Sequence, residues 1–302
     1  MDWDSAAGCP ATADATPLFQ YPPGPAAVDS IVVTRGDVDR LEPDEFLNDN
    51  LVDLYVKVLV ADAARSRLAA REGFDAARLG SEVHAFSSHF FTKLQEEGLR
   101  APDGKDRAHD RVERWTRGVD VFSKKFLVVP IVADQHWSLA IVCHPGALVR
   151  VVRDRVGGAT ARPRRSCAAR PCIIFMDSLK MHKPAKVERF LRAFLECEWA
   201  KRKPDEPELK LKLKVDLPLV VPKVPMQTNS CDCGVYVLRY AEEFLSRAVG
   251  AAPTVAVTEA AVDDKFAAHD FASWFTAAEV AAMRGDLKAA AEDLAVAASA
   301  SA

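Results

Sequence analysis

Two runs rich in β-branched residues, separated by only two residues, constrain the fold of this chain more than any other feature. Residues 126–133 read FLVVPIVA and residues 136–143 read HWSLAIVC, with Asp134 and Gln135 between them. Val and Ile favour strands, and a two-residue connection between strands is typical of a tight hairpin. The sequence therefore predicts an antiparallel hairpin with His136 at its mouth.

Further periodic segments surround this hairpin. A third apolar run, CIIFMD at 172–177, predicts a strand that ends in Asp177, and an amphipathic helix follows at residues 185–203. A helix that opens at Pro43 and Asp44 carries one wide apolar stripe, formed by Phe46, Leu47, Leu51, Leu54, Tyr55, Val58 and Leu59. Strands surrounded by helices in this way predict an α+β fold class.

The segment VPMQTNSCDCGVYVLRYAEEFLSRAV changes character after Pro225. From Asp232 onward its apolar residues recur at helical spacing, at Val235, Leu238, Tyr240, Ala241 and Phe244. This pattern predicts a helix that is largely buried in the core, with Cys233 in its first turn.

Charge and cysteine content exclude several classes of function. Lys and Arg total 40 against 43 Asp and Glu, so the net charge of -3 provides no electrostatic footprint for nucleic acid or an anionic membrane. No apolar run approaches the roughly 20 residues needed to span a bilayer, and the start of the chain lacks the pattern of a secretory signal. The seven cysteines, odd in number and scattered, suit reduced thiols in the cytosol or nucleus. We therefore expect a protein or a small molecule as the partner.

Composition also divides the chain. Residues 1–27 are rich in Ala, Pro, Asp and Thr without apolar periodicity, which predicts a disordered N-terminal tail. Residues 28–285 are expected to form one folded domain, interrupted at 144–171 by a basic loop insertion rich in Arg, Gly and Ala. Residues 286–302 are predicted to be an Ala-rich C-terminal tail, the fraying end of a helix.

Cys233 has the placement that a nucleophilic thiol requires. The thiolate is the reactive form, and the unpaired N–H groups at a helix N-terminus favour negative charge there. Cys231 lies before the helix, on the turn, so we prefer Cys233 as the nucleophile. Two other interpretations compete, because cysteines are commonly small buried hydrophobes and a C-x-C pair can bind metal. The sequence lacks a second Cys/His pair at zinc-site spacing, so we expect no metal.

A nucleophilic cysteine also needs a base that a third group holds in the correct tautomer. His136 at a strand mouth and Asp177 at a strand end could supply both. Spacing alone does not single out His136, since solvated or core roles are expected for six others: His84, His89, His109, His144, His182 and His269. Gln227, on the loop before Cys233, is a candidate donor to an oxyanion together with the backbone N–H of Cys233.

Four separated motifs resemble, in the same order, those of the SUMO-specific cysteine proteases, the sentrin-specific or Ulp-type family with a papain-like fold. HWSLAIV carries His136, IIFMDSL carries Asp177, and QTNSCDCGVYVLRYAEEF carries Cys233. LEPDEFLNDNLVDLYVKVL is similar to the first helix of the family, and RVERWTRGVDVFSKKFLVVPI to its approach to the first strand. The resemblance covers about residues 30–285.

The resemblance implies roles for individual residues. His136 is then the general base, Asp177 orients it, and Cys233 is the nucleophile. Gln227 is then the oxyanion donor. Trp137 is then the lid of a narrow channel that admits only the Gly-Gly tail of the protein modifier SUMO. An aromatic lid leaves no room for the Cβ that every residue other than glycine carries. The implied fold is a central mixed sheet flanked by helices, the catalytic domain spans 28–285, and no cofactor is needed.

The resemblance also implies a substrate. Phe46 stands where many members carry Trp, and Asp49 matches an acidic position that faces the modifier. Together with ASWFTAAEVAAMR (272–284), Phe46 resembles the branch that edits poly-SUMO chains rather than the branch that matures precursors. The implied activity is hydrolysis of the isopeptide or peptide bond after the C-terminal Gly-Gly of SUMO. SUMO and SUMO-conjugated proteins are then the partners. The expected location is the nucleus, with the cytoplasm as a second location.

This chain departs from the family pattern at two points. The insertion at 144–171 is absent from the shortest members of the family, and the sequence S-C-D-C-G places Cys231 beside the nucleophile. We hypothesise that Cys231 forms a protective oxidised pair with Cys233.

Three alternative functions stay open at this point. The same fold could act on another modifier, ubiquitin or the NEDD8-type, because the catalytic motifs do not encode the recognition face. Acetyl transfer by the same order of catalytic residues would need an acyl-CoA site, and the sequence lacks a Gly-rich loop that could cradle phosphates. A catalytically silent SUMO-binding module would have no need of the intact catalytic set.

Overall fold

The computed structural model describes residues 14–24, 30–61, 76–96, 98–99, 103–148, 171–206, 208–211, 216–249 and 271–300. Most of the predicted insertion, residues 149–170, lies outside these ranges, as do residues 1–13. Within the described residues the chain forms helices and a mixed sheet, which confirms the predicted α+β class.

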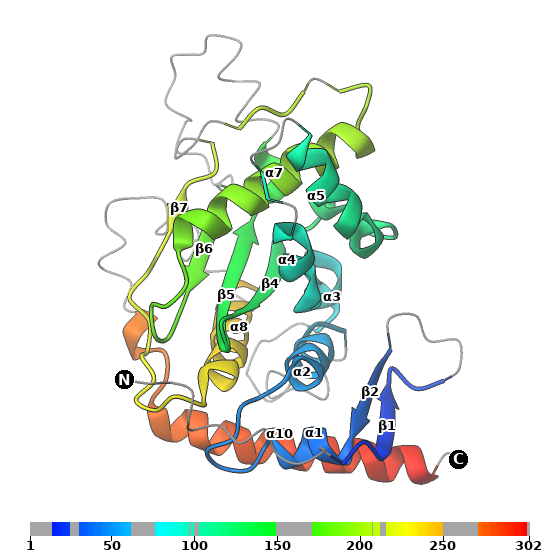
Figure 1. Cartoon of the computed structure of the whole chain (residues 1–302), viewed down its shortest axis with the longest axis vertical. Coiled ribbons are helices and arrows are strands. Elements are labelled where there is room, and N and C mark those ends of the chain that lie inside the picture. The colour runs from blue at the N-terminus through cyan, green and yellow to red at the C-terminus, as the bar shows by residue number, and fades with distance from the viewer. Residues whose placement is uncertain are drawn as a thin grey trace.

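The centre of the fold is a mixed sheet with five strands in the described part of the chain (Figure 1). Their order is β3 (Val83–Ala85), β4 (Phe126–Ala133), β5 (His136–Cys143), β6 (Cys172–Met176) and β7 (Leu219–Val220). The central strands β4, β5 and β6 pair antiparallel, whereas β3 and β7 each pair parallel with their neighbour. This sheet corresponds to the predicted central mixed sheet.

The turn between β4 and β5 determines where His136 lies. Asp134 and Gln135 have positive φ angles, of 51° and 56°. Two consecutive left-handed residues form the kind of turn whose twist suits a two-residue hairpin. Ala133 pairs with His136 directly across this turn, so His136 is the first residue of β5. The predicted hairpin and the bounds of its two strands are confirmed.

One face of the sheet packs against α2 (Asp49–Ala61) and α8 (Cys233–Ala248), and α10 (Ala277–Ala300) packs in turn on α8. Successive strand residues point to opposite faces, and this face receives Val128, Leu139, Ile141 and Ile174. Helix α8 is buried at every position from Cys233 to Leu245. The prediction of a largely buried helix that starts at the candidate nucleophile is therefore confirmed.

The opposite face packs against α4 (His89–Gln95) and α7 (Pro184–Arg202), and α5 (Gly104–Val112) packs in turn on these two helices. It receives the alternate strand residues, among them Leu127, Val129, Ile173 and Phe175. The sheet thus lies between two layers of helices (Figure 1). Its central strands are covered on both faces, which explains why their sequences are apolar at nearly every position.

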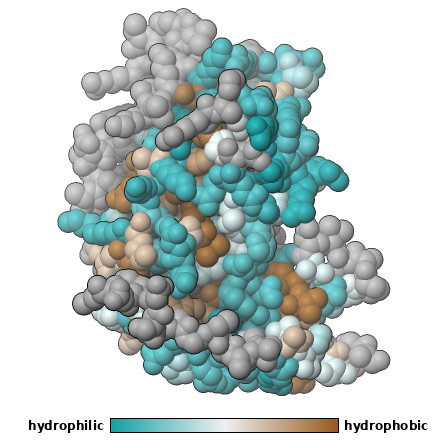
Figure 2. Space-filling model, viewed as in Figure 1, coloured by the Kyte–Doolittle hydropathy of each residue, from teal (hydrophilic) through white to brown (hydrophobic). Residues whose placement is uncertain are grey.

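Shorter elements complete the described chain. They are α1 (Arg35–Asp39), α3 (Ala76–Glu82) and single 3₁₀ turns at Glu113–Thr116, Val121–Ser123, Pro145–Ala147 and Phe271–Ser273. None of the helices in the described ranges combines the length and apolar content needed to cross a membrane. Figure 2 shows hydrophilic residues over most of the described surface on one side of the molecule, with hydrophobic residues in separate patches.

Helix α2 begins later than the sequence pattern predicts. The apolar stripe suggested a helix that opens at Pro43 and Asp44, but Asp44 has a left-handed φ of 65° and the helix starts at Asp49. The side chain of Asn48 accepts a hydrogen bond from the backbone N–H of Leu51 at 3.2 Å, as an N-cap residue does. The cap therefore sets the start of the helix.

Both predicted tails differ from the structure in part. Pro17–Tyr21 forms strand β1, which pairs antiparallel with β2 (Ile31–Thr34) and buries Phe19, so the predicted disordered tail 1–27 includes ordered structure. At the other end, α10 continues to Ala300, and Leu287 and Ala291 on its inner face are buried within the predicted tail 286–302. Both corrections have one cause: β1 and α10 pack against each other, although they lie near opposite ends of the sequence.

The polar stretch around α5 also contributes to the core. His109 is fully buried, and its Nε2 lies 2.6 Å from the buried Glu198 in α7. Two polar side chains can be buried together when they form a hydrogen bond with each other, but composition alone does not reveal such pairing.

Candidate active site

His136 and Asp177 meet where two neighbouring strands end. His136 is the first residue of β5, and Asp177 directly follows the last residue of β6. Because β5 and β6 run antiparallel, the start of one lies beside the end of the other. His136 Nε2 lies 2.7 Å from Asp177 Oδ1, and both side chains are buried. A carboxylate accepts, so Nε2 carries the proton and Nδ1 is left for another partner.

The loop after β6 holds the Asp177 carboxylate. Oδ1 accepts from the backbone N–H groups of Leu179 at 2.9 Å and Lys180 at 2.8 Å. Oδ2 accepts from the N–H of His182 at 2.9 Å. Burial alone would raise the pKa of Asp177, but the hydrogen bonds from His136 and from backbone N–H groups lower it below its ordinary value. Asp177 therefore stays ionised beside the imidazole.

Cys233 is the first residue of α8, as the sequence predicts. Its side chain is buried, and the residue after it, Gly234, lies against Leu47. A Cβ added to Gly234 would lie 2.9 Å from the Cβ of Leu47, closer than two such atoms approach in proteins. Glycine therefore allows the segment around Leu47 to pack directly on the first turn of the helix.

The imidazole of His136 interacts with both other predicted catalytic side chains. Burial alone would lower its pKa, but hydrogen bonds with Asp177 and with the Cys233 thiol raise the pKa to about 9. The structure thus brings His136, Asp177 and Cys233 together. An imidazole between a thiol and a carboxylate can take the thiol proton and stabilise the resulting thiolate.

Cys231 has a different environment from Cys233. Its Sγ lies 4.0 Å from Oδ1 of Asp44. Burial, followed by the negative charge of Asp232, raises the pKa of the Cys231 thiol. Since the thiolate is the nucleophile, this environment disfavours Cys231 and supports the choice of Cys233. Both thiols are free, and the hypothesis of a protective pair between them stays a prediction.

Gln227 lies beside the residue that follows Asp177. Its backbone N–H donates to the carbonyl of Ser178 at 3.3 Å, and its side-chain Oε1 accepts from the Ser178 hydroxyl at 2.5 Å. Its Nε2 donates to the carbonyl of Asn229 at 2.9 Å. An amide NH₂ group has two donors, so a second N–H can serve an oxyanion. These bonds fix the amide on the loop that approaches Cys233.

Trp137, Phe46 and Asp49 differ in exposure. Trp137 is buried, and its indole Nε1 donates to the carbonyl of Leu47 at 3.2 Å. Phe46 is exposed, although it is a large apolar residue, and the Asp49 side chain is also solvent-accessible and lies 3.9 Å from His89 Nδ1. The predicted lid residue is therefore anchored, and the two predicted modifier-facing residues are accessible to a partner.

His182 is a residue to which the sequence analysis assigned no catalytic role. Its ring lies against that of His136, with centroids 5.0 Å apart and an angle of 61° between the planes. Its Nδ1 lies 2.7 Å from Ser138 Oγ, and its Nε2 lies 3.1 Å from the carbonyl oxygen of Ala133. The available signal was its position, in the loop that follows a strand ending in Asp177.

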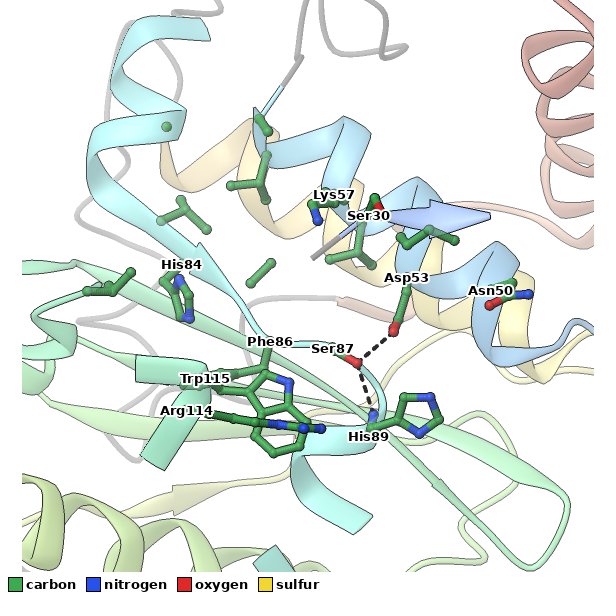
Figure 3. A pocket seen from close by; sticks show the side chains of 18 of the residues that line it. Ser30, Asn50, Asp53, Lys57, His84, Phe86, Ser87, His89, Arg114 and Trp115 are labelled. Atoms are coloured by element: carbon green, nitrogen blue, oxygen red, sulfur yellow. Dashed lines mark hydrogen bonds between the residues drawn. The ribbon is translucent and has the colours of Figure 1, made fainter. Parts of the chain in front are cut away.

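A cavity of about 810 Å³ lies between α2, β3 and the start of α4 (Figure 3). In its wall the Asp53 carboxylate accepts from the Ser87 hydroxyl at 2.7 Å and from the Ser88 N–H at 2.7 Å. None of the predicted catalytic residues is among the described residues that line it. In the described part of the chain, no cluster of His, Cys, Asp and Glu has the arrangement of a metal site.

Proteins of known sequence are similar to this chain. It is 32% identical over 272 residues to Sentrin-specific protease 7 of Rattus norvegicus, an alignment that covers 75% of this chain and 25% of that protein. It is 32% identical over 239 residues to Probable ubiquitin-like-specific protease 2A of Arabidopsis thaliana, covering 78% of this chain and 27% of that protein. The chain thus spans about a quarter of the length of these two relatives.

A solved structure and a family model agree with these similarities. The structure described as "Crystal structure of the de-sumoylating protease" matches with a TM-score of 0.62 at 22% identity and covers 88% of both chains, which shows a shared fold. The model described as "Ulp1 protease family, C-terminal catalytic domain" matches residues 45–266, well over half of this chain and all of the residues assigned to catalysis above. The chain therefore belongs to the Ulp1 protease family.

Proposed function

We propose that this chain is a cysteine protease that hydrolyses the isopeptide or peptide bond after the C-terminal Gly-Gly of SUMO. The observation that carries the catalytic part is the 2.7 Å contact between His136 Nε2 and Asp177 Oδ1, together with the influence of the Cys233 thiol, which helps to raise the pKa of His136. The choice of SUMO is supported by family membership and by relatives named sentrin-specific and ubiquitin-like-specific proteases.

The first chemical step is acylation of Cys233. His136 takes the thiol proton, and the thiolate attacks the carbonyl carbon of the terminal glycine of the modifier. The tetrahedral intermediate then collapses with cleavage of the C–N bond. His136 returns the proton to the departing lysine ε-amine, and a thioester remains on Cys233. Asp177 keeps the imidazole in one tautomer and stabilises its charged form.

The developing oxyanion needs hydrogen-bond donors in fixed positions. The backbone N–H of Cys233 at the start of α8 and the Nε2 of Gln227 are the groups proposed for this role. The Ser178 hydroxyl holds the amide oxygen of Gln227 and so directs the NH₂ end of the amide. A donor that is already oriented loses little entropy when the charge appears.

The second step is hydrolysis of the thioester. His136 removes a proton from a water molecule, the resulting hydroxide adds to the thioester carbonyl, and the C–S bond breaks. The Cys233 thiolate is regained, and the modifier leaves with a free C-terminal carboxylate. The imidazolium then returns its proton to the thiolate, which restores the thiol and imidazole that began the cycle.

Substrate selection is proposed to use the anchored indole of Trp137. Its hydrogen bond to the carbonyl of Leu47 fixes the ring, and Leu47 in turn packs on Gly234 beside the nucleophile. A channel under a fixed aromatic ring suits a tail of glycines, since any Cβ would meet the ring. The accessible Phe46 and Asp49 are proposed to contact the folded part of the modifier.

The test is labelling with a SUMO probe whose C-terminal glycine carries a thiol-reactive electrophile, beside an equivalent ubiquitin probe. We expect the SUMO probe to label the wild type and Cys231→Ala, and to leave Cys233→Ala unlabelled. Cys231→Ala is the matched control because it removes a neighbouring thiol. Labelling that survives in Cys233→Ala would refute the assignment of the nucleophile. Labelling by ubiquitin alone, or by a NEDD8-type probe alone, would favour another modifier, and labelling by none would favour a silent SUMO-binding module.

Two finer properties belong to the same proposal. The sequence segment 272–284 and Phe46 resemble the chain-editing branch, so we propose that poly-SUMO chains are the preferred conjugates. Faster cleavage of SUMO chains than of a single SUMO fused to a peptide would support this, and equal rates would argue against it. We also propose a nuclear location, which imaging of the fluorescently tagged protein would test.

A further inference from the structure

His182 contacts both strands of the hairpin that carries His136. Its Nδ1 lies 2.7 Å from the hydroxyl of Ser138 in β5, and its Nε2 lies 3.1 Å from the carbonyl oxygen of Ala133 at the end of β4. A carbonyl oxygen can only accept, so Nε2 donates, and in a neutral ring Nδ1 then accepts from the Ser138 hydroxyl. Both ring nitrogens are therefore in use, and the orientation of the ring is determined.

The backbone of the same residue holds Asp177. The N–H of His182 donates to Asp177 Oδ2 at 2.9 Å. One residue therefore connects the loop after β6 to the β4–β5 hairpin, through its side chain on one side and its backbone on the other. These two elements carry Asp177 and His136, whose own hydrogen bond is 2.7 Å long.

The ring of His182 also packs against His136, with the ring centroids 5.0 Å apart. Burial lowers the pKa of His182, and among the smaller influences the charge of His136 acts in the same direction. His182 is therefore the neutral member of the pair when His136 is protonated. A neutral ring restricts the movement of its charged neighbour without repelling it.

We propose that His182 is a positioning residue that braces the Asp177 loop against the β4–β5 hairpin and so holds His136 in the orientation that serves Cys233. The proposal rests on the catalytic roles proposed above, but it concerns their geometry and not the identity of the modifier. Misplacement of a catalytic group by about 1 Å can cost on the order of 100-fold in rate. Since His182 has no assigned contact with the substrate, its loss should leave substrate binding intact.

The kinetic test uses His182→Ala, Ser138→Ala and the double variant, with a fluorogenic SUMO substrate. We expect His182→Ala to lower kcat by about tenfold with KM changed less than about twofold, the signature of a lost transition-state interaction. Ser138→Ala should lower kcat by about threefold, and in the His182→Ala background it should have little further effect, because both act through one hydrogen bond. The control is His84→Ala, which removes another half-buried histidine from the edge strand β3 and should leave kcat within about twofold.

A second readout does not depend on the modifier. The rate of alkylation of Cys233 by iodoacetamide, followed by mass spectrometry of the peptide that contains it, reports the contact between thiol and imidazole. We expect about a tenfold lower rate in His182→Ala, and partial recovery in His182→Asn, whose side-chain oxygen can accept from Ser138. If His182→Ala fails to fold, Ser138→Ala and His182→Asn carry the same test.

Two outcomes would overturn the brace. The first is that folded His182→Ala has the kcat and the alkylation rate of the wild type. If His182→Ala does not fold, the same result in Ser138→Ala and His182→Asn counts instead. The other is an additive double variant, or a KM that changes as much as kcat. If instead the wild type cleaves no SUMO substrate while alkylation still slows in His182→Ala, the modifier assignment fails and the brace stands.

Discussion

Arg284 and Asp232 form an ion pair of 2.6 Å that joins α10 to the residue directly before Cys233. The Arg284 guanidinium is buried, and it also donates to three backbone carbonyls in the loop before α2, those of Arg40, Glu42 and Glu45. One side chain near the end of the described chain therefore holds both the turn before the nucleophile and the loop that leads to Phe46.

We predict that Arg284→Met lowers the free energy of unfolding by about 3 kcal/mol, because it leaves a partly buried carboxylate and several carbonyl groups without their donor. Urea denaturation followed by circular dichroism measures the change. The control is Lys288→Met on the same helix, where the lost partner is the exposed Glu42 and the change should be much smaller. Equal losses in the two variants would show that the buried position of Arg284 has no special effect.

Gly234→Ala should damage both stability and activity. The new Cβ would lie 2.9 Å from the Cβ of Leu47, and Leu47 cannot move away without shifting the carbonyl that binds Trp137. We expect a loss of about 1–3 kcal/mol in the free energy of unfolding. The rate of SUMO cleavage should fall as well.

The control for this variant is Gly285→Ala in α10. An added Cβ at Gly285 meets no atom within 4 Å, so only the better helix propensity of Ala remains. We expect Gly285→Ala to gain about 0.5–1 kcal/mol in the free energy of unfolding. A destabilised Gly285→Ala together with a neutral Gly234→Ala would contradict the packing argument.

The rate of cleavage should fall as pH rises through about 9. The pKa of His136 is raised to about 9, so the imidazolium that protonates the leaving amine is present below this value and lost above it. Asp177→Asn removes one of the hydrogen bonds that raise this pKa, so the loss should begin at lower pH. A pH–rate profile and NMR titration of His136 measure both shifts. If the fall in rate at high pH occurs at the same pH in Asp177→Asn as in the wild type, deprotonation of His136 does not cause it.

Stability should fall as pH drops from about 6.5 to about 4. Burial, reinforced by nearby lysines, lowers the pKa of His84 and of His144 from 6.5 to about 4. In this window the unfolded chain binds protons that the folded chain cannot, so each histidine reduces the free energy of unfolding by roughly 2 kcal/mol. Above pH 6.5 both histidines are neutral in both states, and the effect is absent. In the double variant His84→Gln and His144→Asn, the free energy of unfolding should depend less on pH than in the wild type. Urea titrations at pH 7, 5.5 and 4.5 measure it.

Local patterns were sufficient to predict the centre of the fold. The strands 126–133 and 136–143 have the predicted bounds, and α7 differs from its prediction by one residue at each end. Cys233 begins α8 as its apolar spacing indicates. These features depend on neighbours within a few residues, such as β-branched runs, helical periodicity and a two-residue turn, so a sequence read in short windows contains them.

Segments that depend on distant partners could not be predicted in the same way. Strand β1 and the inner face of α10 pack against each other, although they lie near opposite ends of the sequence. Alternating or periodic apolar residues are too sparse in these segments to indicate burial by themselves. Their order comes from packing that only the assembled chain provides.

Local patterns were enough to place the candidate catalytic groups, a thiol at a helix start, a histidine at a hairpin mouth and a carboxylate at a strand end, because each placement depends on its local element. How these groups are held depends on contacts that exist only in the folded chain. His182 braces His136 and Asp177 through bonds to β4 and β5, and Arg284 reaches Asp232 from α10. Such contacts join residues up to 52 positions apart in the chain, and they form only when hydrophobic burial has brought the elements together.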